Sequence, residues 1–206
     1  MIKPLKIAIL ASGSGTNLEA IAGAIDRGEV PAEIVLVLSD NPDAYALERA
    51  RGRGIPTKVV RPADYADRPA YDAAIIEALK EAGVGLVVLA GYMKLVGPAF
   101  VEAFRGRIMN IHPALLPGFP GEHGVEDALA HGVKVSGVTV HFVDDGLDTG
   151  PIIVQAAVPV EEDDDKESLH NRIHEREYRV YPEAIKLFAE GRLRIEGRRV
   201  HVKPPR

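Results

Sequence analysis

The sequence predicts an α/β fold with a Rossmann-like, mostly parallel twisted sheet and helices on both faces. First, short apolar runs alternate with segments whose apolar residues recur every three or four positions, as in strands followed by helices. Second, the runs are nearly continuous, which is typical of parallel strands covered on both sides. Third, the later apolar segments indicate hairpins, so we expect antiparallel strands toward the C-terminus.

Eight segments between Lys6 and Phe104 follow this alternation. The first strand is expected at Lys6–Ala11, and Leu18, Ile21 and Ile25 recur at helical spacing behind it. Right-handed crossovers should connect the parallel strands. The other expected strands are Glu33–Ser39, Thr57–Val60 and Leu86–Ala90, and the other expected helices are Tyr45–Arg53, Arg68–Ala82 and Pro98–Phe104.

The second half should begin with a buried strand at Ile108 that ends before Pro113, because proline cannot donate to a strand ladder. A long glycine-rich loop separates two further expected strands, which suggests a hairpin of unusual shape. In the long last helix, Tyr181-Pro182 is expected to cause a kink or a break. The expected elements are a helix at Val125–Ala130, strands at Val135–Val143 and Pro151–Val160, a helix at Lys166–Ala189 and a terminal hairpin within Arg192–Val202.

Composition excludes several classes of protein. A net charge of −5 argues against a nucleic-acid binder that relies on bulk positive potential. Without cysteine there is no disulfide framework, thiolate nucleophile or cysteine metal site. No apolar segment approaches the roughly 20 residues that a membrane span needs. We therefore expect a soluble, cytoplasmic protein.

A glycine-rich loop, Ser12–Asn17, joins the first strand to the first helix. Such a loop lets backbone N–H groups approach an anion, and the helix N-terminus favours negative charge. We therefore predict a phosphate site here. A tight turn without a ligand is the alternative, because glycine loops alone are weak evidence.

Two polar side chains mark the end of the strand that starts at Ile108. Asn110 and His112 lie two residues apart, so both leave the same face at the carboxyl end, where α/β sheets place ligands. A carboxylate such as Asp148, in the later glycine-rich loop, would favour the charged imidazole and fix its tautomer. A protonated histidine beside an amide donor could stabilise an oxyanion and supply a proton. The alternative is a structural histidine bonded to the backbone.

The sequence lacks the parts of covalent acyl and P-loop mechanisms, since it has no Gly-x-Ser-x-Gly motif, Walker lysine or cysteine. That leaves direct attack of one bound substrate on another. His170 and His174 have the spacing of a helical metal pair, but Asn171 replaces the zincin glutamate and no third ligand is evident. We expect no metal.

Separated motifs together resemble the folate-dependent formyltransferase family, and in particular its phosphoribosylglycinamide formyltransferase branch. The formyltransferase signature is matched by Asn110–Pro117 and His141–Pro151. The branch is matched by Ser12–Leu18, by Leu89–Lys94 and by Glu177 before Tyr181-Pro182. The resemblance covers Lys6 to Arg194. Ala114, Gly118 and Val125 depart from the family's usual residues, but none of them belongs to the Asn-x-His motif or the distal aspartate.

The resemblance implies transfer of a formyl group from 10-formyltetrahydrofolate to the amine of 5'-phosphoribosylglycinamide in de novo purine (IMP) biosynthesis. Asn110 and His112 would stabilise the oxyanion, and Asp148 would raise the imidazole pKa and orient the ring or a proton-relaying water. The substrate phosphate would be held by Gly15, Thr16 and Asn17, and its glycinamide end by His174, Glu175, Arg176 and Glu177. The folate would be held by Arg68, Met93, Lys94, Leu95, Val96, Asn110, Asp144, Asp145, Gly146, Leu147 and Asp148.

We expect one formyltransferase domain over residues 1–206. Residues 1–105 would form its phosphate-binding half, and residues 106–206 its catalytic and folate-binding half. The expected partners are the two small-molecule substrates, with no nucleic acid and no membrane, and a homodimer is the assembly we consider.

Two other functions are weighed against this one. A formyltetrahydrofolate hydrolase is the nearest, because water could replace the amine. A nucleotide-binding, non-catalytic module is more distant. Gly13, Gly15 and Asp40 partly mimic a dinucleotide fingerprint, but Leu18 occupies the position of its third glycine.

Overall fold

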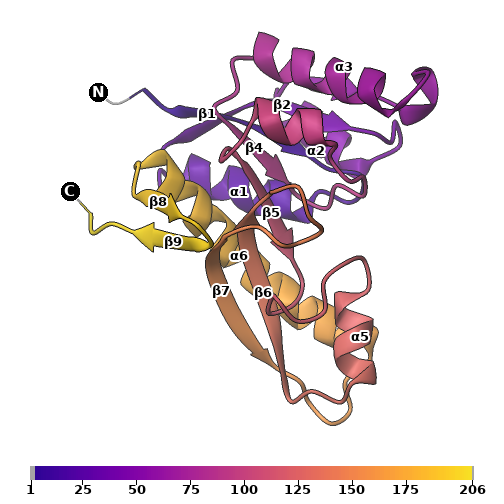
Figure 1. Ribbon diagram of the computed structural model, residues 1–206, viewed down its shortest axis with the longest axis vertical. Helices are drawn as coiled ribbons and strands as arrows, with labels where there is room; N and C mark the ends of the chain where they lie inside the picture. The colour runs from indigo at the N-terminus through magenta and orange to yellow at the C-terminus, as the bar shows by residue number, and fades with distance from the viewer. Residues whose placement is uncertain (1–2, 206) are drawn as a thin grey trace. The chain divides into compact units, whose positions relative to one another are not determined.

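Figure 1 shows residues 3–205 of the chain in a computed structural model. The chain forms two compact units, residues 1–109 and 110–206. Their boundary falls inside strand β5 (Ile108–His112), so this strand begins in the first unit and ends in the second. Within residues 3–205, no helix combines the length and the apolar character that a membrane crossing requires.

The first unit is built on parallel strands, as the alternating pattern predicted. The strands β1 (Leu5–Leu10), β2 (Ala32–Ser39), β3 (Thr57–Val59) and β4 (Leu86–Leu89) follow the order β3-β2-β1-β4. Every pairing within this group is parallel. The start of β5 continues the order, since the Val87 amide donates to the Arg107 carbonyl over 2.9 Å. Chain direction across the sheet reverses between β3 and β4, so β1 and β4 form a topological switch point.

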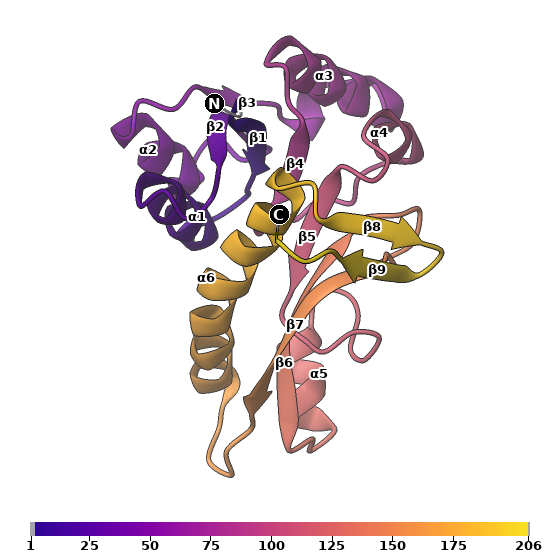
Figure 2. The ribbon, with the colours of Figure 1, turned by 90° about the vertical axis from the view of Figure 1, so that its left-hand side faces the viewer.

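The helices of this unit lie on both faces of its strands. Figure 2 shows α1 and α2 on one side and α3 and α4 on the other, as right-handed crossovers require when the strand order reverses. α3 starts cleanly because the Asp67 carboxylate accepts a hydrogen bond from the Ala70 amide (2.9 Å). The bounds are α1 (Thr16–Asp26), α2 (Tyr45–Gly52), the short 3₁₀ helix η1 (Pro62–Asp64), α3 (Arg68–Glu81) and α4 (Pro98–Ala103).

The second unit contains the predicted antiparallel strands. After the end of β5 the order is β6-β7-β9-β8, with β6 antiparallel to β7 and β8 antiparallel to β9. The terminal hairpin joins the sheet through a parallel contact between Ile152 and Arg199. The strands are β6 (Val135–Phe142), β7 (Ile152–Pro159), β8 (Leu193–Glu196) and β9 (Arg199–Val202).

Two helices accompany these strands, α5 (Gly124–Ala130) and α6 (Lys166–Ala189). α6 packs along β6 and β7 (Figures 1 and 2). Of the two outcomes expected at Tyr181-Pro182, a kink or a break, the break is wrong, because α6 runs unbroken through Pro182. Proline removes one backbone donor, but Tyr181 and Pro182 are themselves buried with Ala184 and Ile185, and this packing holds the helix together.

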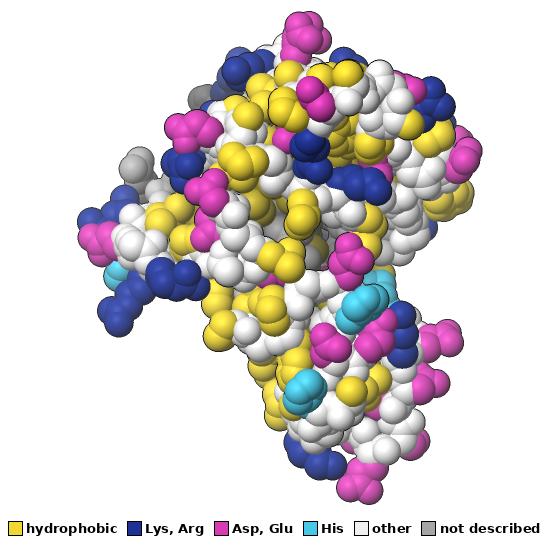
Figure 3. Space-filling view, turned by 45° about the vertical axis from the view of Figure 1, so that its right-hand side comes forward, with side chains coloured by type: hydrophobic (Ala, Val, Ile, Leu, Met, Phe, Trp, Pro, Cys, Tyr) yellow, Lys and Arg dark blue, Asp and Glu magenta, His cyan; other side chains and the backbone are white. Residues whose placement is uncertain are grey.

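Charges of both signs are spread over the face that Figure 3 shows. Figure 3 shows Lys and Arg side chains interspersed with Asp and Glu on one face, with apolar side chains between them. This mixture agrees with the modest net charge of −5. It gives no continuous basic face on the side that is shown.

Gly137 tests the packing between β6 and its neighbours. A Cβ at this position would lie 2.2 Å from the Ala156 carbonyl oxygen and 2.7 Å from Cδ2 of Leu115. We expect Gly137→Ala to lower the free energy of unfolding by about 1–3 kcal/mol, the usual cost of overpacking. Urea denaturation measures the difference. Gly52→Ala is the matched control, because a Cβ there meets nothing within 4 Å, and equal stability of the two variants would contradict the packing described.

Candidate active site

The structure brings Asn110, His112 and Asp148 together in the second unit. Oδ1 of Asp148 accepts a hydrogen bond from Nδ2 of Asn110 (3.3 Å), and Oδ2 lies 3.4 Å from Nδ1 of His112. The Gly121 amide donates to the same Oδ2 over 2.8 Å. The carboxylate therefore joins the end of β5 to the loop that follows β6 and to the loop before α5.

The backbone of the β6–β7 loop aims Asp148 at β5. Asp148 itself has φ +53°, a left-handed conformation that aspartate tolerates better than most residues. Oδ1 of Asp144 accepts from the Gly146 amide (3.1 Å) and from Oγ1 of Thr149 (2.6 Å), which stiffens the loop. At its end Gly150 lies so close to Phe142 that a Cβ would be 1.7 Å from the Phe142 carbonyl oxygen. The loop therefore depends on a glycine at this position.

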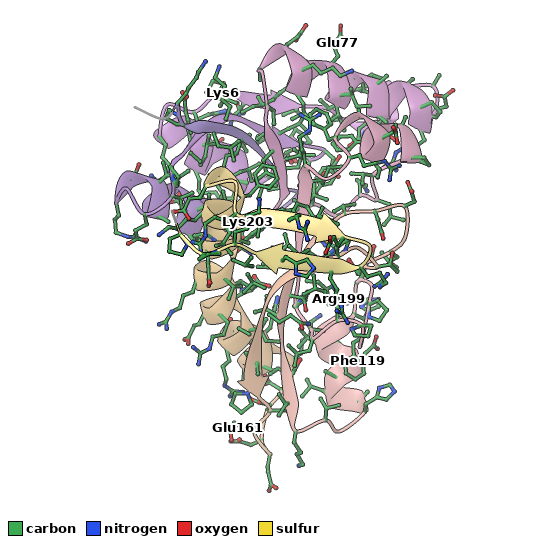
Figure 4. The ribbon with its side chains drawn as sticks, turned by 60° about the vertical axis from the view of Figure 1, so that its left-hand side comes forward. Lys6, Glu77, Phe119, Glu161, Arg199 and Lys203 are labelled. Carbon is green, nitrogen blue, oxygen red and sulfur yellow. The ribbon has the colours of Figure 1, made fainter. Side chains whose placement is uncertain are left out.

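His112 is buried, and both of its ring nitrogens have neighbours. Nε2 lies 2.7 Å from the Phe119 carbonyl oxygen, which can only accept, so Nε2 carries a proton. Figure 4 shows Phe119 in the loop between β5 and α5. In the neutral ring, Nδ1 then presents its lone pair to Asp148. The ring can take up a proton at Nδ1, next to the carboxylate.

Burial and neighbouring charges shift the pKa of His112 in opposite directions, and they do the same to the pKa of Asp148. Burial lowers the pKa of His112 below 6.5, and the opposing effects of the Asp148 charge and the Phe119 carbonyl do not offset it. Asp148 thus acts on the imidazole in the direction expected from the sequence, but burial is the larger effect. Burial also favours a neutral Asp148, yet its contacts with His141 and Gly121 and the histidine charges bring the pKa of Asp148 below 3.8. The free site therefore holds a carboxylate beside a neutral imidazole at neutral pH.

A buried hydroxyl fixes the path of the chain after His112. Oγ1 of Thr139, on β6, donates to the Ala114 carbonyl (2.7 Å) and accepts from the Leu116 amide (3.0 Å). Nε2 of Gln155, on β7, donates to the Leu116 carbonyl (3.0 Å) and lies 2.9 Å from the Thr139 hydroxyl. These bonds hold the exit of β5 against the β6–β7 hairpin, so the position of His112 is set from two strands.

In the first unit, the glycine loop has the geometry of an anion-binding turn. Gly15 caps α1 with φ +74°, and a Cβ on it would lie 2.7 Å from Cα of Ala46. Only glycine fits there. Gly15, Thr16 and Asn17, the residues predicted to hold a phosphate, form the N-cap and the first turn of α1.

Ser12 ties this loop to the ends of two other strands. Its hydroxyl donates to Oδ1 of Asp40 (2.5 Å), after β2, and accepts from the Met93 amide (2.9 Å), after β4. Asp40 also lies 3.9 Å from Nζ of Lys94. Asp40 is thus engaged within the protein, which weakens the dinucleotide-binding alternative, where that carboxylate would bind a ribose.

Contacts of Arg68, the first of the predicted folate residues, lead through Tyr71 to Tyr92. Nε of Arg68 donates to Oδ1 of Asp72 (2.7 Å), and its guanidinium lies 5.5 Å from the centre of the Tyr71 ring. The Tyr71 hydroxyl hydrogen-bonds the hydroxyl of Tyr92. Tyr92 directly precedes the predicted residues Met93, Lys94, Leu95 and Val96, of which Met93 and Leu95 expose large apolar side chains. The Asp144–Asp148 loop lies in the second unit and exposes Leu147.

On α6, the structure separates the four predicted glycinamide contacts into two faces. His174 and Glu177 lie one turn apart, with Nε2 3.7 Å from Oε2, and Glu177 is buried. Glu175 and Arg176 are exposed, because a helix turns about 100° per residue and directs them away. The rings of His170 and His174 are 4.0 Å apart, and burial lowers the pKa of both. Across residues 3–205, no group of three or more potential ligands is placed to hold a metal ion.

Sequence reasoning missed three contacts of the site: His141, the Phe119 carbonyl and the Gly121 amide. His141 is buried, and its Nε2 lies 3.3 Å from Nδ2 of Asn110 and 3.5 Å from Oδ1 of Asp148. Its place at the start of the matched segment His141–Pro151 was the available signal. The two backbone groups left no signal, because any residue carries them.

Comparison with known proteins identifies the family. The formyl transferase family model matches residues 5–185. The phosphoribosylglycinamide formyltransferase of Bacillus subtilis is 45% identical over 181 residues, which are 88% of this chain and 93% of that protein. The crystal structure of glycinamide ribonucleotide transformylase 1 from Symbiobacterium toebii superposes with a TM-score of 0.97 at 54% identity, covering 99% of this chain and 96% of that one.

A much longer relative matches this chain over only a small part of its own length. The trifunctional purine biosynthetic protein adenosine-3 of Drosophila melanogaster is 47% identical over 188 residues, which are 90% of this chain but 14% of that protein. The family match covers most of the chain, and the bacterial relatives match it nearly end to end. The α/β fold expected from the sequence is confirmed. The chain belongs to the formyltransferase family.

Proposed function

We propose that the chain transfers a formyl group from 10-formyltetrahydrofolate to the amine of 5'-phosphoribosylglycinamide, a step of purine (IMP) biosynthesis. The observation that carries the proposal is the cluster of Asn110, His112 and Asp148 at the end of β5. Family membership and the names of the full-length relatives support the same reaction.

The reaction needs no protein nucleophile. The substrate amine attacks the formyl carbon and forms the new C–N bond, and the carbonyl oxygen becomes an oxyanion. Nδ2 of Asn110 and the Nε2 proton of His112 are the donors that stabilise it. Because that proton rests on the Phe119 carbonyl in the free protein, His112 must exchange this bond for the oxyanion when substrate binds.

His112 and Asp148 then carry the proton from the attacking amine toward the folate. The neutral ring accepts the proton released by the amine at Nδ1, where Asp148 stabilises the imidazolium. The proton passes, directly or through a water, to N10 of the folate as the C–N10 bond breaks. Bonds and charges balance, since the formyl group changes nitrogen and the amine proton ends on N10.

Each unit supplies part of the substrate recognition. The α1 N-terminus at Gly15, Thr16 and Asn17 holds the phosphate, and His174 and Glu177 meet the glycinamide. Glu175 and Arg176 remain contacts predicted from the family resemblance. Arg68, Met93, Lys94, Leu95 and Val96, together with Asp144–Asp148, hold the folate. We also propose that the two units work as one formyltransferase domain in the cytoplasm. The homodimer stays a prediction.

The direct test is turnover with and without the amine. The protein mixed with 10-formyltetrahydrofolate and 5'-phosphoribosylglycinamide should raise the ultraviolet absorbance as deformylated folate is released. Without the amine the absorbance should stay flat. Equal rates in both mixtures would identify a formyltetrahydrofolate hydrolase, and no rate in either would overturn the proposal.

His112→Ala tests the proton relay. We expect kcat to fall about 10²- to 10³-fold, the range for losing one oxyanion donor, while the Kd for the phosphate substrate stays unchanged. Steady-state kinetics and calorimetric titration measure the two effects. His201→Ala, on exposed β9, should match the parent protein. A His112→Ala kcat within threefold of the parent would exclude this role.

Asp148→Asn tests the coupling between carboxylate and imidazole. The Asp148 charge raises the pKa of His112 against burial, so its removal lowers that pKa further. The rate requires the neutral ring and falls as pH drops through this pKa, so the acid limb of the pH–rate profile should move to lower pH. Exposed Asp163→Asn is the control. An acid limb that does not move would show that Asp148 is not coupled to His112.

A further inference from the structure

We propose that Asp72 is a positioning residue that holds the Arg68 guanidinium by one nitrogen and leaves the two terminal nitrogens free for the folate. The inference rests on the proposed function, in which Arg68 binds the folate. Asp72 lies on α3, within the first unit, and has no part in the reaction described above. It is 3% exposed, and aspartate is almost never this buried unless it is paired.

Two contacts restrict the Arg68 side chain. Its Nε donates to Oδ1 of Asp72 over 2.7 Å, and its guanidinium carbon lies 5.5 Å from the centre of the Tyr71 ring. That ring is buried, and the hydrogen bond between the hydroxyls of Tyr71 and Tyr92 holds its far end. A fixed acceptor and a fixed ring therefore leave the guanidinium little freedom to rotate.

The terminal nitrogens of Arg68 remain available. Across residues 3–205, no hydrogen bond or ion pair engages Nη1 or Nη2, and the Arg68 side chain is 43% exposed. Two parallel N–H groups of a guanidinium match the two oxygens of a carboxylate. The carboxylates of a folate are those of its glutamate tail, so the free edge of Arg68 fits that part of the molecule.

The pair is poorly arranged for the stability of α3. Arg68 is the first residue of this helix, where the helix dipole disfavours a cation. An acid four residues after a base is also the less favourable order on a helix. Burial of Asp72 adds a cost of desolvation. A pair that departs from these local rules points to a role other than helix stability.

Gly97 leaves room for the buried carboxylate. A Cβ on Gly97 would collide with Oδ2 of Asp72. Gly97 directly follows the segment Met93–Val96, whose residues are predicted to bind the folate. Asp72 thus contacts Arg68 through one oxygen and packs against the end of this segment with the other. The carboxylate therefore fixes Arg68 relative to the other predicted folate residues of the first unit.

Two substitutions at Asp72 isolate its role as an acceptor. Asp72→Asn removes the charge but keeps an oxygen for Nε of Arg68, whereas Asp72→Ala removes both. We expect KM for 10-formyltetrahydrofolate to be about 3- to 10-fold higher in Asp72→Ala than in Asp72→Asn, the effect of immobilising one side chain on binding. The two variants should share the same kcat and the same KM for the phosphate substrate. Equal folate KM values would show that Asp72 only neutralises Arg68, and would overturn the proposal.

A donor without the glutamate tail tests whether the effect passes through Arg68. With 10-formyltetrahydropteroate, Asp72→Ala and Asp72→Asn should have equal KM values, because the carboxylates that Arg68 binds are gone. In an Arg68→Ala background the two variants should also be equal. A difference that persists in either experiment would indicate altered packing and overturn the proposal. Asp64→Ala is the matched control, because it breaks the exposed ion pair with Arg61 (2.7 Å) and should leave KM unchanged.

One measurement does not depend on turnover. In ¹⁵N NMR spectra, the Nε–H of Arg68 should exchange slowly with water in the parent protein and in Asp72→Asn, and faster in Asp72→Ala. The same spectra show whether each variant is folded. Equal exchange in all three proteins would overturn the proposal. If the parent shows no turnover, it is the proposed function that fails, and the exchange rates still decide whether Asp72 holds Arg68.

Discussion

The arrangement around β5 depends on one buried carboxylate. Asp148 accepts from Asn110 and from the Gly121 amide, and it lies beside the rings of His112 and His141. A carboxylate removed from water is costly unless hydrogen bonds and opposite charge offset the loss of hydration. These neighbours offset it, as the lowered pKa of Asp148 shows. The same contacts that keep Asp148 ionised also assemble the residues of the site.

The glycine loop of the first unit is held by contacts with the segments around it. In the function that we propose, the N–H groups of this loop reach a phosphate, so side chains cannot stabilise the loop by filling it. Ser12 instead anchors the start of the loop to the ends of β2 and β4. Asn41 adds a bond to the Ser12 carbonyl (3.3 Å), and Arg49 one to the Ser14 carbonyl (2.8 Å). These contacts hold the loop through the Ser12 hydroxyl and the carbonyl oxygens of Ser12 and Ser14.

The sequence predicted the elements of the fold well because their signals are local. Apolar runs, glycine after helices and proline after strands placed the bounded elements from Glu33–Ser39 to Lys166–Ala189 within one residue of those observed. The break expected at Tyr181-Pro182 is absent, because burial of the residues on both sides of the proline outweighs the lost backbone hydrogen bond. The sequence could not predict where Asp148 lies, because its position depends on its own left-handed backbone and on Gly150, eight residues after β6 ends at Phe142.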